Sequence, residues 1–190
     1  MCGGNELKFI PQTISDVILI KPKIYKDDRG YFYETFRKDL LENIIGYSIN
    51  FCQDNESKST KGVIRGLHYQ IGSYSQAKLV RVISGRVLDV AVDIRKSSPT
   101  FGQYVAIELS SSNKHQLFIP RGFAHGFIVL SDSARFAYKV DNYYSPEHDR
   151  GIAFNDEDIG IKWRIPDLNI IFSEKDKMLP KLKNAVDLFD

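Results

Sequence analysis

The chain has 190 residues and a net charge of +2, from 26 Lys and Arg against 24 Asp and Glu. Acidic and basic residues are interspersed along the sequence, which gives no electrostatic case for binding nucleic acid or a membrane surface. The length predicts a single domain spanning residues 1–190, large enough to bury a substantial hydrophobic core.

The two cysteines, Cys2 and Cys52, are too few for a disulfide framework, and neither belongs to a CxxC motif. We interpret them as free thiols in a reducing compartment. The first residues, MCGGN, lack the basic and apolar regions of a secretory signal. No apolar run approaches the roughly 20 residues that a membrane helix needs. These features predict a soluble, cytoplasmic protein.

In chain order, residues 7–20 alternate loosely between apolar and polar and end at Lys21-Pro22, which predicts edge strands. A turn signal at residues 27–30 precedes an aromatic-rich strand over residues 31–36. Residues 38–46 form the short helix candidate, closed by Gly46. Residues 49–55 are predicted to form another strand.

Beyond Gly62 the strand signals recur roughly every 8 to 12 residues with turn residues between them, which favours an antiparallel sandwich or small barrel. A tight turn at Ser84-Gly85 joins the first two of these strands. The polar tail from residue 172 onward is a candidate for helix. The predicted strands are residues 79–83, 87–93, 104–109, 117–120, 127–130 and 134–140.

Alternation in residues 87–93 puts Leu88, Val90 and Val92 on one face of the strand. The opposite face carries Ala91 between two aspartates, at positions 89 and 93.

Four histidines are present, and a lone histidine is more often structural than catalytic. His115 and His148 lie in polar, turn-like contexts and are assigned no role. His68 (RGLHYQ) and His125 (PRGFAHGF) each follow a glycine by a few residues and border an apolar strand. We therefore expect both to lie at strand ends facing the mouth of a barrel.

Residues 120–125 match PxGxxH, the second half of the cupin barrel pattern, which raises the question of a metal site. Metal-binding cupins add an HxH pair and a glutamate, since a transition metal takes three or four nitrogen and oxygen ligands. Here the first half is His68-Tyr69-Gln70, and no glutamate follows at the expected distance. We therefore expect no metal.

Three further residues each have a structural interpretation beside a functional one. Lys78 opens an apolar strand, where it is either an edge-strand gatekeeper or a fixed cation that stabilises an oxyanion. Tyr138, considered alone, is a core tyrosine with a bonded hydroxyl, and Asp176 is a surface charge. Spacing does not connect these residues to one another.

A resemblance to a known family does connect them. The chain resembles the dTDP-4-dehydrorhamnose 3,5-epimerases, cupin-type enzymes of dTDP-L-rhamnose and surface polysaccharide biosynthesis. The resemblance extends over nearly the whole chain, from DDRGYFYETF to SEKDKMLP. It implies a mainly β fold, an antiparallel double-stranded β-helix (cupin or jelly-roll barrel) with a few short helices. The motifs that carry it, in order, are GVIRGLHYQ, QAKLVRVISGRVLDVAVDIRKSSPTFG, IPRGFAHGFIVLSD, YKVDNYYSPEHDRGI, NDEDIGIKW and SEKD.

The resemblance also implies catalytic roles. His68 matches the general base that removes the protons at C5 and C3, both α to the 4-ketone. Asp176 matches the carboxylate that fixes the tautomer of this histidine and raises its basicity. Lys78 matches the residue that stabilises the enolate oxygen, and Tyr138 matches the acid that returns a proton to the opposite face. The ketone already acidifies both carbons, so no redox cofactor is implied.

Binding roles follow in the same way for a nucleotide-diphosphate 4-keto sugar. Arginines suit the diphosphate because a guanidinium donates bidentate hydrogen bonds. Tyr144 matches the residue that stacks on the base. The resemblance also implies a homodimer with exchanged N-terminal strands, in which Arg29 and Glu34 serve the neighbouring site. The matched ligand contacts are Arg29, Glu34, Gln53, Asp54, Asn55, Arg65, His125, Tyr144, Asp149 and Lys175.

Two positions depart from the family pattern. Asp149 stands where glutamate is common, and Arg164 stands where proline is common. Three other functions remain open at this point. They are a 3,5- or 5-epimerase of another nucleotide-linked 4-keto sugar such as a GDP-linked heptose, a 3,4-ketoisomerase, and a non-catalytic carbohydrate-binding barrel.

Overall fold

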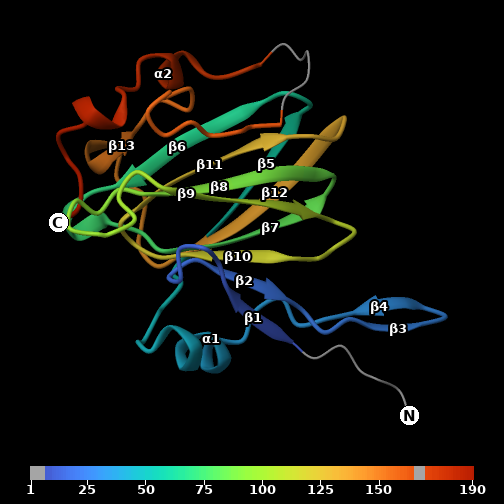
Figure 1. Ribbon diagram of the computed structural model, residues 1–190. Coiled ribbons are helices and arrows are strands. Elements are labelled where there is room, and N and C mark those ends of the chain that lie inside the picture. Colours follow the sequence, from blue (N-terminus) through green and yellow to red (C-terminus); the bar gives the residue numbers. More distant parts are fainter. Residues whose placement is uncertain (1–6, 165–169) are drawn as a thin grey trace.

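The computed structural model describes residues 7–164 and 170–190, and two antiparallel sheets dominate it (Figure 1). The larger sheet has six strands. In spatial order they are β1 (Lys8–Pro11), β2 (Ile18–Lys21), β10 (Gln116–Ile119), β7 (Lys78–Ser84), β12 (Ser133–Val140) and β5 (Gln53–Thr60).

The smaller sheet has five strands and lies face to face with the first. In spatial order they are β13 (Asp149–Gly151), β6 (Ile64–Gln70), β11 (Phe123–Val129), β8 (Arg86–Asp93) and β9 (Tyr104–Ser110). All strand pairs in both sheets are antiparallel. The predicted mainly β, antiparallel architecture is confirmed.

Apolar side chains on the two inner faces pack against one another between the sheets. The larger sheet contributes Val80, Val82 and Phe136, and the smaller sheet contributes Ala91 and Phe127. A second cluster, which includes Leu88, Val90 and Val92, lies on the outer face of the smaller sheet. The expected division of residues 87–93 into two faces is therefore confirmed, but neither face is solvated, because C-terminal segments cover the outer one.

The turn at Ser84-Gly85 has a different role from the one expected. Its two strands, β7 and β8, do not pair with each other, since they belong to opposite sheets. Gly85 adopts φ +80, and a Cβ there would lie 2.1 Å from the carbonyl oxygen of Ser133. A glycine is needed because the chain turns a corner between the sheets where another backbone passes close by.

The N-terminal segments lie at one side of the larger sheet. Helix α1 (Lys38–Ile45) ends at Gly46, which adopts φ 79 and caps the helix as predicted. The aromatic strand predicted over residues 31–36 is shorter than expected, because β4 (Gly30–Phe32) pairs only with β3 (Tyr25–Asp27). This two-stranded hairpin extends away from the barrel (Figure 1).

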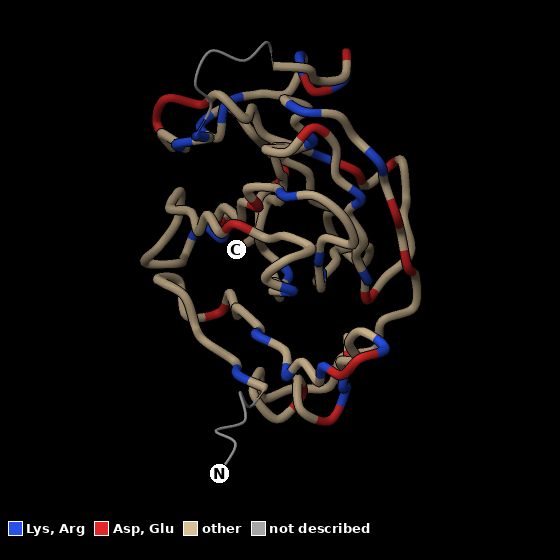
Figure 2. The backbone as a smooth tube through the Cα atoms, turned by 90° about the vertical axis from the view of Figure 1, so that its right-hand side faces the viewer, with Lys and Arg blue, Asp and Glu red and all other residues tan. Residues whose placement is uncertain are grey.

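The expected helical tail is reduced to single turns. They are α2 (Glu174–Lys177) and the 3-10 turn η3 (Leu182–Asn184), beside two further 3-10 turns, η1 (Gly72–Tyr74) and η2 (Pro146–His148). Among the described residues, no helix is long and apolar enough to cross a membrane. Figure 2 shows basic and acidic residues interspersed around the barrel.

Candidate active site

A pocket of about 620 Å³ opens between the inner faces of the two sheets. Strands of both sheets line it, together with the segment that leads into α2. All four residues that the resemblance marks as catalytic line this pocket, although 108 positions separate the first from the last. They are His68, Lys78, Tyr138 and Asp176.

His68 and Asp176 form a close pair. The Nε2 atom of His68 lies 2.6 Å from Oδ1 of Asp176, whose side chain is almost fully buried. Burial alone would raise the pKa of Asp176, but the hydrogen bonds from His68 and Ser173 outweigh it and lower this pKa. An ionised Asp176 accepts the Nε2–H proton, so Nδ1 of His68 carries the lone pair and is free to act as a base.

The two site histidines lie inside strands, so the expectation that they lie at strand ends is wrong. His68 is in β6 and His125 is in β11, and the two are paired across the sheet. The glycines beside them allow two backbones to approach closely. A Cβ on Gly66 would lie 2.5 Å from the Cα of Gly126, and one on Gly126 would lie 2.6 Å from the carbonyl oxygen of Arg65. These glycines therefore mark a close approach of two strands within the sheet and not the ends of strands.

Lys78 lies in β7, a central strand between β10 and β12, so it is not an edge-strand gatekeeper. Its Nζ donates to the carbonyl oxygen of His68 at 3.3 Å. Burial lowers the pKa of Lys78 to about 8, while the carboxylates of Asp149 and Asp89 act in the opposite direction. The ammonium is therefore retained at neutral pH, close to the backbone of the histidine.

Tyr138 projects into the pocket from β12, in the sheet opposite His68. Its ring packs against the apolar core and lies 6.1 Å from the ring of Phe136. Burial is the main cause that raises the pKa of Tyr138, so its phenol stays protonated over a wide pH range. The pocket thus has an imidazole with a free lone pair on one wall and a protonated phenol on the other.

A polar cluster of three side chains lies at the same pocket. Asp149 accepts hydrogen bonds from the hydroxyl of Tyr144, at 3.1 Å, and from Nζ of Lys175. Lys175 precedes Asp176 in α2, so this contact ties the segment that carries the carboxylate to the Tyr144 loop. The shorter aspartate at position 149 reaches both partners.

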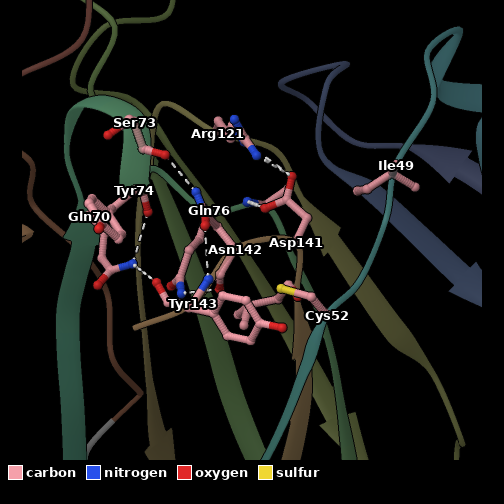
Figure 3. Close-up of polar contacts among 12 residues, drawn as sticks. Ile49, Cys52, Gln70, Ser73, Tyr74, Gln76, Arg121, Asp141, Asn142 and Tyr143 are labelled. Atoms are coloured by element: carbon pink, nitrogen blue, oxygen red, sulfur yellow. Dashed lines mark hydrogen bonds and ion pairs between the residues drawn. The ribbon is translucent and has the colours of Figure 1, made fainter. Parts of the chain in front are cut away.

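The loop that presents Tyr144 is held by a network of side-chain amides (Figure 3). Gln70 Nε2 donates to the carbonyl oxygens of Tyr74, at 2.9 Å, and Tyr143, at 3.0 Å. Gln76 Nε2 donates to the carbonyl oxygen of Asn142 at 2.8 Å. Gln70, which stands where metal-binding cupins have a histidine, therefore positions a loop. This role of Gln70 could not be predicted from the sequence, because the loop that it holds is more than 70 residues away along the chain.

The structure places the remaining predicted ligand contacts differently. Asn55, Arg65 and His125 line the pocket. Gln53 does not line the pocket but contacts two residues that do: its amide donates to Asn55 at 2.9 Å and accepts from the backbone N–H of Tyr144. Asp54 is different, because it pairs with Lys139 and its side chain is 70% exposed.

Arg29 and Glu34 lie outside the pocket of their own chain. Arg29 is at the tip of the β3–β4 hairpin, pairs with Asp27, and has a side chain that is 91% exposed. Glu34 is exposed and accepts from Arg37 at 3.4 Å. Of the two family departures, Asp149 lines the pocket, whereas Arg164 lies 3.9 Å from Glu108 outside it.

One pocket-side pair was missed by sequence reasoning. Nε2 of His125 lies 2.9 Å from Oδ2 of Asp89, and both side chains are buried. The sequence signal for this pair is Asp89, an aspartate within the valine-rich run of residues 87–93. Alternation predicts which residues share its face of the strand, but it does not predict whether that face is buried. Within residues 7–164 and 170–190, no three His, Cys, Asp or Glu side chains are grouped to hold a metal ion.

Comparisons with known proteins agree on one family. A family model described as dTDP-4-dehydrorhamnose 3,5-epimerase matches residues 11–184. The chain is 54% identical over 170 residues to the enzyme of that name from Shigella flexneri, covering 90% of this chain and 93% of the relative. It is 51% identical over 183 residues to that of Escherichia coli K12, covering 96% and 98%.

Solved structures give the same result. One is the dTDP-6-deoxy-D-glucose-3,5-epimerase of Legionella pneumophila in complex with dTDP-4-keto-L-rhamnose. It superposes with a TM-score of 0.90 at 47% identity, covering 94% of each chain. The dTDP-4-dehydrorhamnose 3,5-epimerase of Elizabethkingia anophelis superposes with a TM-score of 0.90 at 48% identity, covering 95% of this chain and 98% of the other.

Proposed function

The chain belongs to the dTDP-4-dehydrorhamnose 3,5-epimerase family, and we propose that it converts dTDP-4-dehydro-6-deoxy-D-glucose to dTDP-4-dehydro-L-rhamnose in this pocket. This is an isomerase reaction of dTDP-L-rhamnose synthesis. One observation supports the assignment above the others: His68 and Tyr138 enter the pocket from opposite sheets, and Lys78 lies beside the histidine.

The base in this proposal is Nδ1 of His68. It removes a proton from the carbon next to the 4-ketone, first at C5 and then at C3. Asp176 supports this role because its hydrogen bond holds the proton on Nε2 and stabilises the imidazolium that forms. When the C–H bond breaks, its electron pair moves into the ring and the ketone oxygen becomes an enolate.

Lys78 stabilises that enolate with its ammonium, and Tyr138 returns a proton to the opposite face of the same carbon. Inversion requires removal on one face and delivery on the other, which a base and an acid on facing sheets can supply. A fixed cation at a developing oxyanion contributes on the order of 10² to 10³ in rate.

The nucleotide is assigned to the end of the pocket near Tyr144, Asp149 and Lys175. Tyr144 is 54% exposed, so its ring is free to stack on a base. To test the substrate, kcat/KM would be measured with dTDP-linked and GDP-linked 4-keto sugars, the latter including a 4-keto heptose. We expect turnover of the dTDP-linked hexose. Turnover of the GDP-linked heptose alone would instead identify an epimerase of a different sugar nucleotide.

The rate is expected to depend on the ionisation of Lys78. Burial lowers its pKa to about 8, so the ammonium is lost as the pH rises through this value. We therefore expect kcat to fall above about pH 8, and steady-state rates across the alkaline range would measure it. A rate that stayed level to about pH 10, near the pKa of an ordinary lysine, would show that Lys78 does not act as a buried cation.

We propose a homodimer in which the β3–β4 hairpin reaches the neighbouring subunit. A two-stranded hairpin is marginally stable by itself. This one carries exposed aromatic side chains, Tyr31 at 58% and Phe32 at 66% exposed, which a second subunit would cover. Arg29, at its tip, would then contact the diphosphate in the partner's pocket.

A hybrid dimer tests this arrangement. Arg29→Ala and His68→Asn chains, carrying different affinity tags, would be coexpressed and the hybrid purified through both tags. If Arg29 acts across the interface, one of the two sites is complete, and turnover should be about half that of the wild type. If Arg29 acts within its own chain, neither site is complete and the hybrid should be as inactive as either parent.

We further propose that one domain spanning residues 1–190 carries the activity and that the protein is cytoplasmic. The match of the family model to residues 11–184 supports the first point. The free thiol of Cys52 supports the second, because reducing compartments keep cysteines unpaired.

A further inference from the structure

Asp89 is a buried carboxylate that the scheme above does not use. It lies on the inner face of β8, opposite Phe127, and is 0% exposed. Its Oδ2 atom contacts His125, but Oδ1 has no hydrogen-bond partner among the described residues. A buried carboxylate with so few donors is costly, so a nearby positive charge would explain its place.

The surroundings of Asp89 are otherwise aromatic. The ring of His125 stacks 6.0 Å from that of Phe136, which in turn stacks 4.2 Å from Phe127. Burial is the main cause that lowers the pKa of His125, against the opposing effect of Asp89. The imidazole is therefore neutral, donates its Nε2–H to Asp89 and leaves Nδ1 as its acceptor.

A neutral His125 leaves the charge of Asp89 to be balanced by another group. Lys78 lines one pocket with His68 on β6, His125 on β11 and Asp149 on β13, and Asp89 on β8 is bonded to His125. Of these four groups, the carboxylates of Asp149 and Asp89 favour the charged form of Lys78. Asp149 already accepts from a lysine and a tyrosine. Asp89 also lies near Lys78, and no other cation in the described part of the chain balances its charge.

We propose that Asp89 is a positioning residue for the enolate side of the reaction: it orients His125 and keeps Lys78 an ammonium beside the 4-keto oxygen. The charge of Asp89 acts on Lys78 through space, while its hydrogen bond acts on His125 directly. The expected effect of Asp89 on turnover rests on the proposed function. Its expected effect on the charge of Lys78 does not depend on which substrate the pocket binds.

The test uses Asp89→Asn, which keeps the size of the side chain but removes its charge. The matched control is Asp93→Asn, because Asp93 is buried on the same face of the same strand but is bound by Arg95, Ser98 and Thr100. In the free protein, ¹³C and ¹⁵N NMR would follow the titration of Lys78. We expect its midpoint to fall by about one pH unit in Asp89→Asn and to stay at the wild-type value in Asp93→Asn.

Turnover of the dTDP-linked substrate gives the catalytic readout. For Asp89→Asn we expect the alkaline limb of kcat to move down by about one pH unit, so that kcat falls about 2-fold at pH 7 and about 10-fold at pH 9, with KM little changed. An unmoved Lys78 midpoint in the folded variant would overturn the inference. Because the NMR titration needs no substrate, failure of the proposed function would appear separately, as a wild-type protein without turnover.

A measurement on the wild type covers the case in which Asp89→Asn does not fold. The ¹⁵N shifts of His125 should report a neutral ring protonated at Nε2. A ring protonated at Nδ1, or at both nitrogens, would overturn the proposal, since Asp89 would then hold a different tautomer or balance an imidazolium.

Discussion

Replacing His68 with asparagine is expected to lower kcat by about 10³- to 10⁴-fold, because it removes the general base from both deprotonation steps. The asparagine amide cannot accept a proton at neutral pH, and it leaves Asp176 without the ring that it orients. Hydrogen–deuterium exchange at C5 and C3 should disappear together with turnover. Both would be followed by NMR of the sugar in D₂O.

His115→Asn provides the control for this variant. His115 is also a half-buried histidine, but it does not line the pocket. Its replacement should leave the rate within a few-fold of the wild type. If His68→Asn kept near-native turnover while folded, another group would be the base and the proposed mechanism would be wrong.

Replacing Tyr138 with phenylalanine is expected to separate exchange from inversion. The variant keeps the ring that packs on the core but loses the hydroxyl that delivers a proton to the opposite face. We expect His68 still to remove the C5 proton and to return solvent deuterium to the same face. Product formation should fall by about 10² or more. NMR would measure deuterium uptake into the substrate beside the yield of inverted product.

Tyr104→Phe is the matched control, since Tyr104 packs on the outer face of the smaller sheet. It should exchange and invert like the wild type. Complete loss of C5 exchange in Tyr138→Phe would contradict the division of roles, because it would make the tyrosine necessary for deprotonation as well.

Much of the fold could be predicted from local signals. Alternation located most strands of both sheets to within a few residues, and Gly46 located the end of α1. The pairing could not be predicted in this way. The turn at Ser84-Gly85 has the local chemistry of a hairpin, yet it passes from one sheet to the other, because register depends on contacts between strands far apart in sequence.

The site shows the same division. The order and spacing of the motifs predicted membership of the family, and the comparisons confirm it. The motifs could not reveal that Gly66 and Gly126 allow β6 and β11 to approach closely, which places His68 and His125 inside strands. Nor could alternation tell a buried Asp89 from a solvated one, since burial depends on which sheet covers the face.

The most direct test of the central claim is incubation of the wild-type protein with dTDP-4-dehydro-6-deoxy-D-glucose in D₂O. The expected product carries one deuterium at C5 and one at C3, both centres inverted, and mass spectrometry with NMR would identify it. Removal and return of a proton at each carbon requires this outcome. A folded protein that gave no exchange, or an inverted product without solvent deuterium, would contradict epimerisation through an enolate in this pocket.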